Sequence, residues 1–243
     1  MPTALTSNSG SELMRKTGPA EGRQLGWYAN LVHNKTILGS LATLVHLPFM
    51  LAFLSFVLIG SLVIPGMNIE VLILSLTVVS LLLYGEHMLD DMERVGKPWS
   101  TVFSDRTLAE FAVILFALSA AIGVYASVAF STLIPFFGVL AGIMFCVLYG
   151  LEVWEFHRTE FGGLGMGAIC AFSYLAQVLV TGSLVEPWTI IMLFAIGFVL
   201  GYIMLWLYEY TKTKEYQKAW RLLGLHLLLI YGLAGVMIWV RAS

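Results

Sequence analysis

Long apolar runs alternate with short polar segments along most of the chain. Seven runs approach or exceed the roughly 20 residues that cross a hydrocarbon core of about 30 Å. They cover residues 37–63, 69–88, 107–130, 133–154, 162–184, 188–209 and 222–240. Lipid offers the backbone no hydrogen-bond partners, so apolar spans of this length fold as helices. The pattern predicts an all-α, polytopic bundle of seven transmembrane helices in a single domain, residues 37–243.

A polar segment precedes the first apolar run. Residues 1–24 are rich in Ser, Thr and Gly, which predicts a disordered tail, and they lack the apolar core of a signal peptide. Residues 25–36 mix aromatic and basic side chains, Trp27 and Lys35 among them. This mixture is typical of an amphipathic helix that lies at the membrane surface.

The basic residues fall almost entirely on one side of the predicted bundle. Of the 13 Lys and Arg residues, all but Arg241 lie in the first 36 residues or near the second, fourth and sixth connections between spans. Cytoplasmic loops are enriched in such residues. We therefore expect the N-terminus and these three loops in the cytoplasm, and the C-terminus outside.

The composition excludes several classes of protein. Of all residues, 59% are hydrophobic and only 12% charged, which argues against a soluble or nucleic-acid-binding domain. Cys146 and Cys170 lie in apolar runs and are expected to be small buried residues rather than a disulfide framework. The last run contains no lysine, which excludes a retinal Schiff base despite the seven predicted spans.

One stretch concentrates charge where the second span ends. Residues 85–106 read GEHMLDDMERVGKPWSTVFSDR. If the helix continues, Glu86, Asp90 and Glu93 share one face at i, i+4 and i+7, and His87 and Asp91 form the adjoining stripe. Carboxylate oxygens suit Mg²⁺. Ionisable groups at the hydrocarbon edge are costly without a role, which favours a site over a merely solvated helix end.

The fourth and sixth spans end in similar clusters on the same predicted face of the membrane. The fourth reads YGLEVWEFHRTEFGG and the sixth WLYEYTKTKEYQKAW. Each brings carboxylates, aromatic rings and basic groups to the cytoplasmic end of the bundle. Convergence of three helix ends predicts one shared site there.

Other small and polar residues indicate packing. Glycines recur at four-residue spacing, which predicts close helix contacts; the pairs are Gly138 with Gly142, Gly163 with Gly167, and Gly197 with Gly201. Pro48 is expected to kink the first span and Pro135 to lie in the first turn of the fourth. Three isolated polar residues within spans are expected to hydrogen-bond neighbouring helices; they are His46, Gln177 and His226.

The order of these features resembles the UbiA-type intramembrane prenyltransferases. Their first motif is NDxxDxxxD, followed by segments of the form R-x-x-K-P-x-R-P and S-G-R. Here Lys97-Pro98 matches the KP pair and Ser104-Asp105-Arg106 the SGR triplet. Glu86 stands at the first Asp and Glu93 at the third, while the middle Asp is displaced to Asp90 or Asp91.

The resemblance extends over about residues 35–224. Tyr149 and His157-Arg158 resemble the Tyr and basic residues that follow the family's fourth span. Tyr208-Glu209 stands where the family has the Asn-Glu that opens its second acidic motif. The two acids expected next are replaced by Lys212 and Tyr216. Seven spans are counted here, whereas the family has nine.

The resemblance implies transfer of a polyprenyl group from an allylic diphosphate to a lipid or aromatic acceptor, with Mg²⁺ as cofactor. It assigns three sets of residues. Metal would be held by Glu86, Asp90, Asp91 and Glu209, and Asp90, Asp91 and Tyr149 would be catalytic. The diphosphate would be bound by Arg94, Lys97, Arg106, Arg158 and Lys212, the last offsetting charge where an acid is lost.

Two alternatives stay open. In the first, the chain is a relative of this family that has lost catalysis and binds lipid or assembles a membrane complex. The altered second motif and the lower span count are consistent with this alternative. A third hypothesis uses nitrogen ligands: His87, His157 and the pair Glu152 and Glu155 would form a transition-metal site for redox chemistry.

Overall fold

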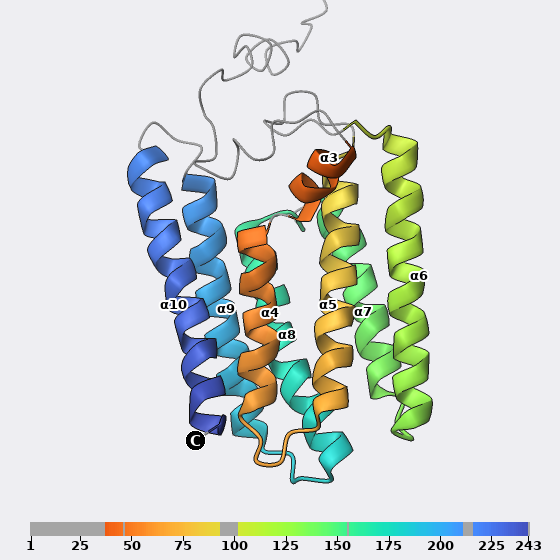
Figure 1. The fold of residues 1–243 in the computed structure, drawn as a ribbon, viewed down its shortest axis with the longest axis vertical. Helices are drawn as coiled ribbons and strands as arrows, with labels where there is room; N and C mark the ends of the chain where they lie inside the picture. Colours follow the sequence, from red (N-terminus) through yellow and green to blue (C-terminus); the bar gives the residue numbers. More distant parts are fainter. Residues whose placement is uncertain (1–36, 46, 93–101, 155, 211–215, 243) are drawn as a thin grey trace, which may run out of the picture.

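The described part of the molecule is a bundle of α-helices (Figure 1). The structure is a computed structural model, and it describes residues 37–45, 47–92, 102–154, 156–210 and 216–242. Within these ranges it contains eight helices and no strand. They are α3 (Ile37–Val45), α4 (Leu47–Leu62), α5 (Ile69–Asp90), α6 (Asp105–Ala129), α7 (Ile134–Gly150), α8 (Thr159–Thr181), α9 (Pro187–Tyr210) and α10 (Tyr216–Ala242).

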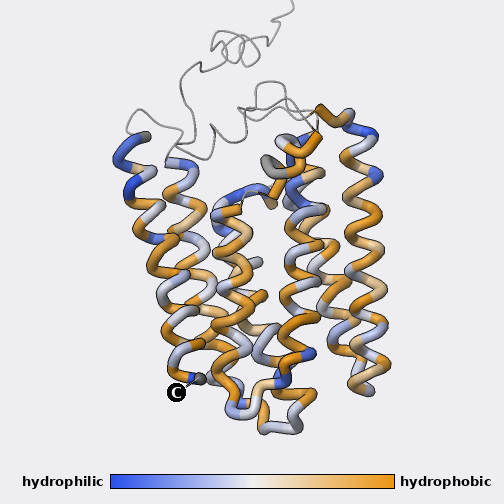
Figure 2. The backbone as a smooth tube through the Cα atoms, in the orientation of Figure 1, coloured by the Kyte–Doolittle hydropathy of each residue, from blue (hydrophilic) through white to orange (hydrophobic). Residues whose placement is uncertain are grey.

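The helices have the length and composition of a membrane protein. Five of them (α5, α6, α8, α9 and α10) are long and apolar enough to cross a bilayer. Two more, α4 and α7, are equally apolar but shorter, with 16 and 17 residues. Figure 2 shows apolar residues along the body of the bundle and polar ones toward its ends. The predicted all-α, membrane-embedded architecture is confirmed at this level.

The helices of the bundle pack around two hydrophobic cores. Helices α4, α8, α9 and α10 enclose the first core, with Phe56, Met166, Met204 and Ile230 at its centre. Helices α3, α5, α6 and α7 enclose the second core, around Leu108 and neighbouring residues. Helix α5 also contacts α4 and α8, which joins the two halves. Helix α5 therefore lies at the boundary between the two cores.

The predicted glycine packing is confirmed between α8 and α9, the most extensive helix contact in the described bundle. A Cβ atom on Gly167 would lie 2.7 Å from the carbonyl oxygen of Phe194, and one on Gly197 2.7 Å from that of Met166. Lipid provides no hydrophobic drive between helices, so such close backbone approach supplies the van der Waals attraction. Gly142 meets Leu82 of α5, whereas Gly138 has a looser environment.

Both predictions for proline are confirmed. Helix α3 ends at Val45 and α4 begins at Leu47, and the two helices run in different directions in Figure 1, with α3 lying over the end of α5. Pro48 follows this point and has no N–H to donate to the helix. Pro135 lies in the first turn of α7, where a missing N–H costs nothing.

The isolated polar residues within the described spans bond to protein, as expected. The Gln177 side chain is fully buried; it accepts from the Asn68 backbone N–H at 2.8 Å and donates to the Asn68 carbonyl at 3.0 Å. His226 of α10 contacts the Leu200 carbonyl of α9 at 2.8 Å. His46 lies outside the described residues, as do the predicted tail (1–24) and surface helix (25–36).

Candidate metal centre

Helix α5 carries the first acidic cluster into the protein before it ends. The helix continues to Asp90, and Asp91 caps its C-terminal end. The Glu86 side chain is buried, and its Oε2 atom lies 3.4 Å from Nε2 of His87. The predicted helix face is therefore present for Glu86 and Asp90. Asp91 has left the helix, and Glu93 lies outside the described residues.

Gly150 brings the end of α7 against the end of α5. A Cβ atom at this position would lie 2.9 Å from the Glu86 carbonyl oxygen and 2.9 Å from Cβ of Leu89. Only a residue without a side chain permits this approach. The close contact fixes the last turn of α7, and with it Tyr149, beside the last turn of α5.

The chain then turns sharply, which corrects the predicted end of the fourth span. We expected that span to continue to residue 154, but α7 ends at Gly150. Glu152 and Trp154 both adopt positive φ angles, 51° and 50°, which a helix does not accommodate. The turn folds the following residues back over the end of α7. His157 thereby places its Nδ1 atom 3.1 Å from the carbonyl oxygen of Tyr149.

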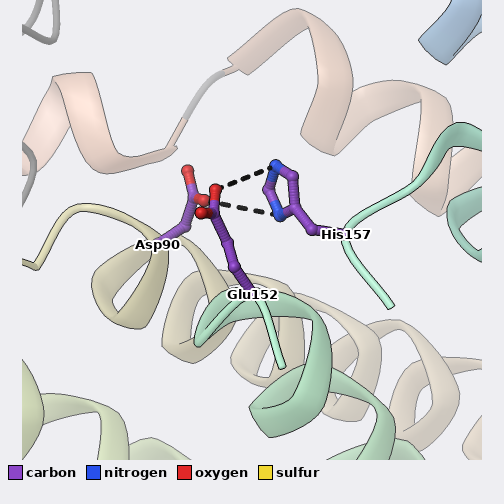
Figure 3. Close-up of side chains that lie close together, drawn as sticks. All are labelled: Asp90, Glu152 and His157. Carbon is purple, nitrogen blue, oxygen red and sulfur yellow. Dashed lines mark ion pairs between the residues drawn. The ribbon is translucent and has the colours of Figure 1, made fainter. Parts of the chain in front are cut away.

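Asp90, Glu152 and His157 meet at this point (Figure 3). Nε2 of His157 lies 3.5 Å from Oε1 of Glu152, and Nδ1 lies 3.8 Å from Oδ1 of Asp90. One potential ligand atom from each residue lies within 4.8 Å of the other two. The group joins the clusters that follow the second and fourth spans, so the predicted convergence of these two helix ends is observed.

Tyr149 lies at the centre of this region. Its ring packs on that of His157, with centroids 4.7 Å apart. The charges of Glu86, Asp90 and Glu209 all act on its hydroxyl group. On the other side, a Cβ atom at Gly162 of α8 would lie 3.2 Å from the hydroxyl oxygen. Carboxylates from α5 and α9 thus lie close enough to one tyrosine at the end of α7 to act on it electrostatically.

The remaining predicted site residues divide into two groups. Arg158 follows His157 directly and is the N-cap residue of α8. The exposed Arg106 forms an ion pair with Glu110 within α6, Nε to Oε1 at 2.8 Å. Four residues proposed as ligands or bases lie outside the described ranges: Arg94, Lys97, Glu155 and Lys212.

The sequence predicted one site shared by the helix ends, but not the particular group of Asp90, Glu152 and His157. The transition-metal hypothesis combined Glu152 and His157 with His87 and Glu155. In the structure His87 lies against the Leu44 carbonyl and Glu86 instead. The five-residue spacing of Glu152 and His157 fits no helix face, because the two residues stand on either side of a turn. No sequence signal marks the positive φ angles of that turn, since neither residue is glycine.

Comparison with known proteins adds no relative. The chain matches none of the protein-family models, curated proteins or solved structures with which it was compared.

Proposed function

We propose that this chain is an integral membrane prenyltransferase of the UbiA type. It would transfer a polyprenyl group from an allylic diphosphate to a lipid or aromatic acceptor with the help of Mg²⁺. One observation carries the proposal. Asp90, from the segment that resembles the family's first acidic motif, lies beside His157 and near Tyr149, from the segment that resembles the family's residues after the fourth span. The two matched segments are remote in sequence but adjacent in space.

The proposal includes seven spans, with the N-terminus and the site on the cytoplasmic side. Helices α4 and α7 lie alongside the five longer helices (Figure 1), so we count both as spans. At the end of the bundle where α5 and α9 finish, described basic residues recur: Arg106, Arg158, Lys218 and Arg221. Cytoplasmic ends are enriched in such residues. Attaching a membrane-impermeant thiol reagent to single cysteines introduced at Ser104 and Ser183 tests this orientation in intact cells, after both native cysteines are replaced.

The donor groups fit a divalent cation. Asp90 and Glu152 offer carboxylate oxygens within a short distance of each other, and Glu86 and Glu209 provide further negative charge around Tyr149. Mg²⁺ prefers such oxygen ligands and usually keeps several waters. When bound, the ion would neutralise charge that develops on the diphosphate leaving group. Asp90 and Glu152 would hold it, with Glu86, Asp91 and Glu209 contributing from nearby.

The residues of the chain would then bind and orient the substrate. Arg158 is the N-cap residue of α8, so its positive charge and the N-terminal end of the helix dipole both favour an anionic diphosphate. Aromatic rings beside the site, such as Phe145 and Tyr149, stack on each other and present π faces that stabilise an allylic cation. The surrounding apolar helices would accept the polyprenyl chain and limit access of water.

The decisive experiment is an assay of prenyl transfer in membranes. Radiolabelled allylic diphosphates of 15 and 20 carbons would be supplied with Mg²⁺ and a lipid extract. The combined change Asp90→Asn and Asp91→Asn should abolish transfer, because it removes negative charge without large loss of volume. Glu70→Gln, at the opposite end of the same helix, is the matched control and should retain full activity.

Unchanged activity in the Asp90→Asn, Asp91→Asn protein would overturn the proposed catalytic site. If the wild-type chain neither transfers prenyl groups nor binds allylic diphosphates by calorimetry, the enzymatic proposal fails. Stoichiometric co-purification with other membrane proteins would then favour the non-catalytic alternative.

A further inference from the structure

We propose that Asp90, Glu152 and His157 bind a divalent transition-metal ion, such as Mn²⁺, Fe²⁺ or Zn²⁺, through one imidazole nitrogen and two carboxylates. The role of this ion in catalysis rests on the proposed function. Binding of the ion does not rest on it, because binding can be measured without prenyl transfer.

The geometry of the three side chains suits one ion. Metal–ligand bonds of about 2.0–2.2 Å place two ligand atoms of one ion about 3–4 Å apart. Nε2 of His157 lies 3.5 Å from Oε1 of Glu152, and Oδ1 of Asp90 lies 3.8 Å from the other ring nitrogen, Nδ1. One potential ligand atom from each of the three residues lies within 4.8 Å of the other two, which is close to the spacing around a single ion.

The orientation of His157 is that of a metal-binding histidine. A backbone carbonyl can only accept a hydrogen bond, so the contact of 3.1 Å to Tyr149 assigns the proton to Nδ1. This leaves Nε2, the nitrogen that faces Glu152, with its lone pair available to a metal. Metal-ligating histidines almost always donate their other N–H to a carbonyl, carboxylate or water, which fixes the tautomer and the ring. Packing of the ring against Tyr149 holds it further.

The group is reachable and leaves coordination positions for other ligands. The His157 side chain is 30% exposed, Asp90 16% and Glu152 48%. An ion can therefore enter from the end of the bundle. Three protein ligands leave at least one position for water or for an oxygen of a bound anion, as in catalytic rather than structural sites.

The nitrogen ligand determines which ions are favoured. Mg²⁺ is bound mainly by oxygen, whereas imidazole suits Fe²⁺, Zn²⁺ and related ions. The structure therefore assigns selectivity to His157: with this residue the site should prefer transition-metal ions, and with a third carboxylate in its place the preference for Mg²⁺ should rise.

Electron paramagnetic resonance with Mn²⁺ as the probe tests the proposal on the purified full-length protein. Titration should show one tightly bound Mn²⁺ per chain, and pulsed spectra of the bound ion should show coupling to an imidazole ¹⁴N nucleus. His157→Asp should keep a bound Mn²⁺ but remove the ¹⁴N coupling, and should lower the preference for Mn²⁺ over Mg²⁺ at least tenfold. Asp90→Asn should weaken binding by at least tenfold.

Two variants test whether the other described histidines contribute to the coupling. His87→Gln and His226→Gln should both retain the ¹⁴N coupling, since these side chains bond to carbonyls elsewhere. Absence of tight Mn²⁺ binding, bound Mn²⁺ without ¹⁴N coupling, or coupling that survives His157→Asp would each overturn the proposal. If His157 only forms ion pairs with Asp90 and Glu152, the protein should bind no Mn²⁺ at this group.

The outcomes separate this inference from the proposed function. Nitrogen-coordinated Mn²⁺ in a chain that transfers no prenyl group would support the metal site and reject the enzyme. If the chain transfers prenyl groups with Mg²⁺ and His157→Asp leaves its metal preference unchanged, the enzyme is supported and the metal site with a histidine ligand is rejected.

Discussion

Nδ1 of His87 lies 3.0 Å from the backbone carbonyl oxygen of Leu44. In a regular helix that carbonyl would accept from the N–H of the residue four positions later. That residue is Pro48, which has no N–H. His87 of α5 therefore supplies a donor in place of the N–H that Pro48 lacks. The same contact explains why His87, although part of the acidic cluster, stands apart from Asp90, Glu152 and His157.

Replacing His87 by Leu should lower the free energy of unfolding by about 1–3 kcal/mol, the cost of an unsatisfied buried carbonyl. Its side chain is only 13% exposed, so water cannot readily replace it. His226→Leu is the matched comparison and should cost less, because the Leu200 carbonyl lies within the regular α9 helix. Thermal unfolding in detergent micelles measures both.

A double-mutant cycle isolates the role of the proline. In a Pro48→Ala background, the restored N–H at residue 48 can bond the Leu44 carbonyl, so His87→Leu should cost less than in the native background. Equal costs in both backgrounds would show that the contact between His87 and Leu44 does not compensate for the proline.

Gly150→Ala should separate the two halves of the candidate metal centre without unfolding the protein. The added Cβ would meet the Glu86 carbonyl oxygen at 2.9 Å and Leu89 at 2.9 Å, so the ends of α5 and α7 must move apart. Asp90 would then lie farther from Glu152 and His157. We expect Mn²⁺ affinity to fall about tenfold or more, measured by the same titration, while helicity by circular dichroism stays unchanged. Unaltered affinity would mean that this close approach does not position the ligands.

The contact between α8 and α9 predicts opposite effects for two glycine substitutions. Gly197→Ala should destabilise by about 1–3 kcal/mol, because its Cβ would lie 2.7 Å from the Met166 carbonyl and 2.9 Å from Cα of Gly167. Gly232→Ala in α10, where nothing lies within 4 Å, should be neutral or stabilise by up to about 1 kcal/mol through helix propensity. A similar loss of stability in both variants would argue against the proposed packing.

Hydrophobic patterning predicted the helices well, because lipid imposes a length and a periodicity that the sequence displays directly. The expected start of the second span at residue 69 coincides with α5, where Asn68 caps the helix through its side chain. The glycine pairs predicted a real interface because small residues have few other uses in a span. The number of spans was harder to decide, since α4 and α7 have only 16 and 17 residues.

The candidate site was predicted only in part. Charge density located Asp90, Glu152 and His157 individually, but their grouping depends on the approach at Gly150 and on the positive φ angle of Glu152. Both are consequences of tertiary packing that local preferences do not reveal. The sequence hypothesis of a shared site therefore brought the helix ends together without indicating which side chains would meet.

Arg241 lies at the opposite end of the bundle from the other described basic residues, and it has a structural role there. Its Nε and Nη2 atoms donate to the carbonyl oxygen of Leu62, at 3.1 and 3.0 Å. Leu62 is the last residue of α4, so its carbonyl has no partner within the helix. A fixed positive charge at a helix C-terminus is also favourable to the helix dipole. Arg241 thus joins the end of α10 to the end of α4.

Arg241→Leu should therefore lower the free energy of unfolding by about 1 kcal/mol. This value is at the low end of the contribution of a hydrogen bond to a charged group, because the Arg241 side chain is exposed to solvent. Arg241→Lys should recover part of this loss, since an ammonium group retains the charge but not the paired donors of the guanidinium. Thermal unfolding in detergent provides the measurement. Cation binding at the distant Asp90 group should be the same in both variants, because the changes lie at the other end of the bundle. A loss of Mn²⁺ affinity together with stability would instead show that the closure of α4 and α10 at one end supports the geometry at the other.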